Sequence, residues 1–165
     1  MKAELKPAMI AVAACAHALD ALYAELAEHV GPETLAQWEQ TRRGGRSAEI
    51  AGVLELSANA DVDEWRPRLR KLFEALRNPA IHPKAKARRL LSHPVLPTNV
   101  PLEYAIYCVE AVEESVDLLL AVLSTCVAAP RAAVATWAND ARGVVDQLVA
   151  SRAAKLGLAK LGLSE

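Results

Sequence analysis

Apolar residues recur along much of the chain at alternating spacings of three and four, which places them on one face of an α-helix. The pattern predicts a long first helix over residues 7–30, then a shorter one to about residue 40 after the break at Gly31-Pro32. Pro7 is compatible with the first turn, because the backbone N–H at that position has no partner inside a helix. The expected apolar face of the long helix consists of Met9, Val12, Ala16, Leu19, Tyr23, Leu26 and Val30.

The middle of the chain predicts two further helices. Residues 42–46 (RRGGR) form a loop by composition, and residues 47–58 form a helix that the serine at its start can cap. Asp61 or Asp63 caps the next helix, which Pro79 then ends or bends. Its expected apolar face consists of Trp65, Leu69, Leu72, Phe73 and Leu76.

The last third of the chain predicts one long amphipathic helix and a terminal helix or helix pair. Residues 79–101 contain five prolines, and we expect only a short helical turn over the basic residues 84–89. Thr98 or Asn99 is the predicted cap of a helix that runs to about Ala128. Its apolar stripe is Leu102, Ala105, Val109, Val112, Val116, Leu119, Leu123 and Cys126, and Pro130 begins the last element.

These elements sum to an all-α fold, an antiparallel bundle of four to five principal helices. No internal repeat interrupts it, so we expect a single domain over residues 1–155 and a loosely held tail over 156–165. Composition agrees, because 53% of residues are hydrophobic but only 4% are aromatic. The excess of Ala, Leu and Val suits closely packed helices better than strands.

The cysteines and the N-terminus indicate a cytoplasmic protein without a metal or cofactor. Cys15, Cys108 and Cys126 are odd in number and lack the CxxC spacing of zinc sites, so we expect buried thiols in a reducing compartment. There is no basic segment followed by an unbroken apolar run, and no stretch of about 18 consecutive apolar residues. We therefore expect neither export nor a membrane partner.

The net charge of −1 conceals a strongly basic segment between Arg66 and Arg89, where nine cations accompany one acid, Glu74. Charged helix faces often serve only solvation, but a block of one sign in a nearly neutral protein favours an anionic ligand. The candidate phosphate-binding residues in this segment are Arg66, Arg70, Lys84, Lys86, Arg88 and Arg89.

One motif carries recognisable chemistry: Arg77-Asn78-Pro79-Ala80-Ile81-His82, at the end of the basic helix. His82 titrates near neutrality and can act as general acid or base. Arg77 offers a permanently charged planar fork that suits phosphate oxygens, and Asn78 can hold the imidazole or the substrate by hydrogen bonds. The plain alternative is that Arg77 and His82 only complement the negative end of a helix dipole.

The motif resembles the signature of the HEPN family of RNA-cutting and RNA-binding helical domains, in which His follows Arg by four to six residues and a polar residue directly follows the Arg. The frame is similar too: a long first helix, the motif at the end of a middle helix, and a long helix after a Pro-rich segment. The resemblance implies a metal-independent endoribonuclease with Arg77, Asn78 and His82 as catalytic residues. It also implies a homodimer in which two motifs face each other, and a toxin or phage-defence role with an antitoxin partner. Lys84 stands where some members carry the Tyr that receives AMP, so that control is not expected.

Two other functions fit the same residues. The first is a non-catalytic helical module that binds RNA, nucleotide or a protein partner through the basic surface. The second is a structural helical dimer in which the motif caps a helix. Binding and cleavage use the same charges, so the sequence does not separate the enzyme from the module.

Overall fold

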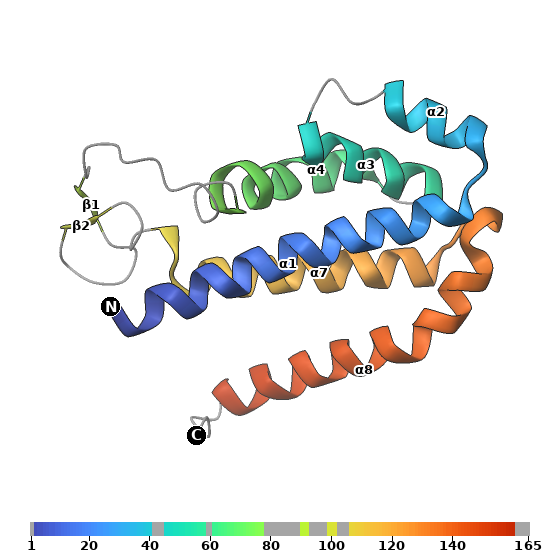
Figure 1. Ribbon diagram of the computed structural model, residues 1–165. Helices are drawn as coiled ribbons and strands as arrows, with labels where there is room; N and C mark the ends of the chain where they lie inside the picture. The colour runs from blue at the N-terminus through green and yellow to red at the C-terminus, as the bar shows by residue number, and fades with distance from the viewer. Residues whose placement is uncertain are drawn as a thin grey trace.

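The computed structural model describes residues 2–40, 45–58, 61–77, 90–92, 99–101 and 106–160. The described chain is mostly helical, as the apolar periodicity predicts, with one small hairpin (Figure 1). The helices are α1 (Lys2–His29), α2 (Pro32–Gln40), α3 (Gly45–Ser57), α4 (Val62–Arg70), the π-helix η2 (Lys71–Arg77), α7 (Val109–Ala128), the 3-10 turn η3 (Ala132–Val134) and α8 (Ala135–Lys160). The strands are β1 (Leu90–Ser92) and β2 (Asn99–Pro101).

Helix α1 is the centre of the bundle (Figure 1). It packs against α3 and η2 on one side and against α7 on another, and α8 packs on α7. The pairs α3–α4 and α7–α8 are antiparallel, whereas α1 and α7 run in the same direction (Figure 1). The predicted helical bundle is therefore confirmed, but its strictly antiparallel order is wrong for the central pair.

The apolar face predicted for the first helix is the core face of α1. Val12, Ala16, Leu19, Leu26 and Val30 are buried, and Met9 and Tyr23 pack at its edge. Burial of each Val or Leu side chain stabilises the folded state by about 1.5–3 kcal/mol, so this face is a main source of stability. The helix begins at Lys2, before the predicted start, and Pro7 lies inside it.

By length and composition α1 is also a candidate membrane span. The segment Leu5–His29 contains a window of mean hydropathy 1.4, of which 33% is buried inside the protein. A core helix of a soluble protein and a signal sequence meet the same two criteria, so this feature is weak evidence. The cytoplasmic location stays a prediction.

Helices α4 and η2 form one continuous helix over residues 62–77, named here the basic helix. Asp61 is the N-cap and accepts a hydrogen bond from the Asp63 backbone N–H at 3.1 Å, so the first of the two predicted caps is confirmed. The α-helical part ends at Arg70 and the chain continues as the π-helix η2, which the periodicity did not predict. The apolar face is nonetheless as predicted: Trp65, Leu69, Leu72, Phe73 and Leu76 are all buried.

The predicted start of the long amphipathic helix is wrong, and the described part of its predicted stripe, apart from the buried Cys126, lies one position away from the most buried line. Leu102 and Ala105 of that stripe lie outside the described residues. Asn99 lies in strand β2, and α7 begins at Val109 after Cys108, whose backbone is extended. The fully buried line is Ala111, Ser115, Leu118, Val122 and Cys126, while Val109 is exposed and Val112, Val116, Leu119 and Leu123 are only partly buried. The reason is that α7 packs between α1 and α8 and so has a wide apolar arc, whose middle is one position away from the predicted stripe.

Smaller differences occur elsewhere. β1 and β2 pair antiparallel with Leu91 opposite Val100, inside the segment where we expected no strand. Helix α3 begins at Gly45, with φ of +73°, so part of the predicted loop is helical and Ser47 is buried inside the helix rather than its cap. Helix α8 continues to Lys160, into the segment predicted to be loosely held. The three cysteines are buried thiols, as predicted.

Candidate functional site

The described part of the motif is its first residue, Arg77, which ends η2. A residue distant in the sequence holds the helical turn that precedes Arg77. The buried Tyr107 hydroxyl donates a hydrogen bond of 2.7 Å to the carbonyl oxygen of Leu76. A carbonyl in the last turn of a helix has no partner inside that helix, so Tyr107 satisfies a group that would otherwise be buried at a cost. This bond fixes the backbone that carries the Arg77 side chain.

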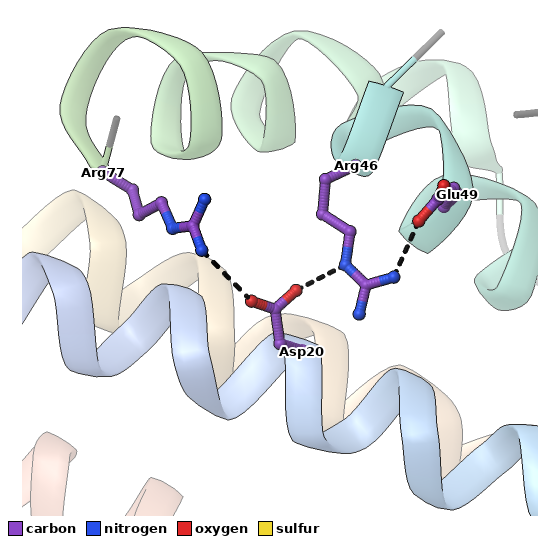
Figure 2. Close-up of polar contacts among 4 residues, drawn as sticks. All are labelled: Asp20, Arg46, Glu49 and Arg77. Carbon is purple, nitrogen blue, oxygen red and sulfur yellow. Dashed lines mark hydrogen bonds and ion pairs between the residues drawn. The ribbon is translucent and has the colours of Figure 1, made fainter. Parts of the chain in front are cut away.

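The Arg77 guanidinium is half-buried and points at helix α1 (Figure 2). One of its terminal nitrogens lies 4.0 Å from an oxygen of Asp20. The other Asp20 oxygen accepts a hydrogen bond of 2.5 Å from Nε of Arg46, at the start of α3. Asp20 therefore lies between two arginines from two different helices, and it connects α1 to both the motif and α3 (Figure 2).

Arg46 makes several close contacts. Besides Asp20 it donates a 2.7 Å hydrogen bond to Glu49, and its guanidinium carbon lies 4.2 Å from the centre of the Tyr23 ring. Burial acts to lower the pKa of Arg46, but the hydrogen bonds to Asp20 and Glu49 raise it above the ordinary value. The charges of Asp20, Glu49, Arg46 and Arg77 cancel, and this cluster is named here the Asp20 cluster.

The cluster gives Arg77 two different capacities. The planar fork of Arg77 suits phosphate oxygens, and its contact with Asp20, at 4.0 Å, is longer than a direct hydrogen bond. The same contact joins η2 to α1, which is also what a purely structural role requires. Geometry alone thus places Arg77 beside a carboxylate and leaves its chemistry to be tested.

Two of the six candidate phosphate-binding residues are described. Arg66 and Arg70 are exposed on α4, where Arg66 lies 3.5 Å from Asp63 and Arg70 donates a 3.0 Å hydrogen bond to Glu74. The remaining candidate residues lie outside the described residues: Asn78, His82, Lys84, Lys86, Arg88 and Arg89. Their convergence with Arg77 stays a prediction.

Sequence reasoning missed Asp20, Arg46, Glu49 and Tyr107. Asp20 carried a weak signal, because it directly follows the buried Leu19 in the long first helix. A carboxylate at the edge of a core face needs a partner. Nothing in the sequence indicated that the partners would be residues 26 and 57 positions away, because that follows from how α3 and η2 cross α1.

Comparison with known proteins finds no matching family model, no matching curated protein and no matching solved structure. The resemblance to HEPN domains therefore rests on the motif and the order of helices in this chain alone.

Proposed function

We propose that the protein is a metal-independent endoribonuclease of HEPN type. The observation that carries the proposal is the position of Arg77. It ends the basic helix at a backbone position held by Tyr107, and its half-buried guanidinium lies 4.0 Å from an oxygen of a carboxylate. Arg77 is the last residue of the π-helix η2, and π-helical turns occur frequently at functional sites. This arrangement supports a phosphate-binding role better than a simple helix cap does.

In the proposed reaction His82 transfers protons and Arg77 stabilises the charge that grows on the phosphate in the transition state. One histidine does not readily deprotonate the 2′-oxygen and protonate the leaving 5′-oxygen in the same step. A homodimer that brings two motifs together supplies the second histidine.

The test is cleavage of a single-stranded RNA by the purified protein in the presence of EDTA. We expect products that end in 2′,3′-cyclic phosphate, because the attacking group is the neighbouring 2′-oxygen. Arg77→Lys is expected to impair cleavage, since a point-charge ammonium does not reproduce the planar fork. The matched control is Arg68→Lys, which changes an exposed arginine of the same helix. Equal rates for Arg77→Lys, Arg68→Lys and the wild type would contradict the proposal.

The dimer has its own test. Light scattering at micromolar concentration is expected to give twice the mass of the chain. A strictly monomeric protein would count against two facing motifs, and so against this mechanism, while leaving the fold unchanged. A toxin or phage-defence role and an antitoxin partner remain expectations from the resemblance.

A further inference from the structure

A cleft with a volume of about 860 Å³ lies between α3 and the basic helix. Arg66, Arg70, Lys71 and Glu74 line one wall, and Ser47 lines the other. The last lining residue along the basic helix is Ala75, two positions before Arg77. The cleft therefore leads along the helix toward the motif, on the side of α3.

The two flanks of the basic helix differ in charge. The α3 cleft is lined by three cations and one acid. The hollows on the α7 flank are lined by Arg68 and Lys71 against Glu110 and Glu114, and Lys71 forms an ion pair with Glu114 there. An anion is therefore attracted more strongly to the α3 flank than to the α7 flank, where the charges of the lining residues cancel.

We propose that the α3 cleft binds consecutive phosphates of a single-stranded RNA and directs the strand to Arg77. Arg66 and Arg70 are one helical turn apart, so their side chains lie side by side on one face, at a separation comparable to that of neighbouring phosphates in a strand. The described lining contains no aromatic side chain on which a base could stack, so the cleft binds the backbone and does not read the bases. The proposal rests on the proposed function and supplies its substrate path.

Glu74 competes with an RNA phosphate for Arg70. In the structure its carboxylate accepts a 3.0 Å hydrogen bond from Nε of Arg70 and a 3.4 Å hydrogen bond from the Ser47 hydroxyl. A phosphate that binds Arg70 must replace this carboxylate and then lies beside its negative charge. Removing the charge without changing the shape, as in Glu74→Gln, is therefore expected to strengthen RNA binding.

The experiment measures binding of a fluorescent 2′-O-methyl RNA 12-mer by anisotropy at several salt concentrations. This probe lacks the free 2′-hydroxyl, so it stays intact whether or not the protein is a nuclease. Arg66→Gln and Arg70→Gln are each expected to weaken binding about fivefold, the ratio carried by an ion pair at the upper end of surface strength. Each is also expected to reduce the slope of log affinity against log salt by about 0.7. Glu74→Gln is expected to strengthen binding by a similar factor.

The matched controls lie on the other flank. Arg68→Gln removes the same charge from the same helix, but Arg68 lines the hollow shared with α7. Glu114→Gln is the corresponding control for Glu74. Equal effects of all three arginine variants, or of both glutamate variants, would show that only net charge matters and would overturn the cleft. Competition by polyglutamate as strong as by unlabelled oligonucleotide would assign the cleft to acidic proteins and overturn it as well.

Failure of the cleft and failure of the nuclease give different results. If the flank-specific pattern is present and the wild type never cuts unmodified RNA, the cleft is supported and the enzyme is refuted. If RNA is cut and binding shows no difference between the flanks, the enzyme is supported and this path is refuted.

Discussion

The Asp20 cluster makes a quantitative prediction for Asp20→Asn. This change keeps the size of the side chain and one oxygen that can accept from Arg46, but it removes the charge that both arginines face. The three side chains are between 23% and 32% exposed, so water screens them only in part. Exposed ion pairs contribute about 0–1 kcal/mol, and removing one partner of a fully buried pair costs about 3–5 kcal/mol.

The partial burial places the expected loss between those limits, at about 1–3 kcal/mol in the free energy of unfolding. For a chain of this length that corresponds to a fall in Tm of roughly 3–8 °C. The control is Asp140→Asn, which removes the same charge from an exposed position on α8. Thermal and urea unfolding at low salt measure both variants. A loss for Asp20→Asn no larger than that for Asp140→Asn would refute the role assigned to the cluster.

Double-mutant cycles divide the effect between the two arginines. The Asp20–Arg46 contact is 2.5 Å long and the Asp20–Arg77 contact is 4.0 Å. The first pair is therefore expected to couple by more than 1 kcal/mol and the second by less, because the interaction weakens with distance and the longer contact is not a direct hydrogen bond. The opposite order would contradict this ranking of the two contacts.

Three further predictions follow from single residues. Tyr107→Phe is expected to lower the free energy of unfolding in urea by about 1–3 kcal/mol, because it leaves the buried carbonyl of Leu76 without the 2.7 Å hydrogen bond. An unchanged stability would contradict this role of Tyr107. Gly45→Ala is expected to cost about 1–2 kcal/mol from its φ of +73°, whereas Gly143→Ala inside α8 is expected to stabilise by about 0.5–1 kcal/mol, since neither added methyl meets an atom within 4 Å. Burial raises the pKa of Cys126 from 9.0 to about 12. Its neutral thiol contributes stability below the unfolded pKa, and this is lost as pH rises, by about 1.4 kcal/mol per pH unit between about pH 9.5 and 11. Cys126→Ala should show a shallower alkaline decline.

The sequence predicted those parts of the fold that depend on one element at a time. The core face of α1 and the five buried residues of the basic helix follow from spacing alone, since each face is covered by neighbours on one broad side. The stripe of α7 was misplaced by one position because α7 packs against both α1 and α8. The spacing of apolar residues does not reveal which of them each neighbour covers. The start of α7 was misplaced because Asn99 is a residue type that favours N-caps, whereas the N-cap of α7 is the extended Cys108, whose side chain makes no capping hydrogen bond.

In the candidate site, too, the sequence predicted what is local to one element and missed what depends on packing between elements. Arg77 was predictable, because its chemistry is local to the motif and to the end of a helix. Asp20 and Tyr107 were not, because their roles depend on where α1 and the segment just before α7 meet η2. The flank-specific charge of the basic helix was hidden for the same reason: Arg68 and Arg70 are two positions apart in the sequence, yet they line different hollows.

The central claim is that the motif cuts RNA, and a single-turnover comparison of the wild type with His82→Ala tests it most directly. Cleavage of an RNA 12-mer is followed in EDTA, and affinity is measured separately with the 2′-O-methyl probe. The account predicts that His82→Ala lowers the cleavage rate by about 10²–10⁴-fold, the range for a lost general acid or base, and leaves affinity nearly unchanged. A wild-type protein that binds RNA and never cuts it, with His82→Ala behaving identically, would contradict the account and leave a binding module in its place.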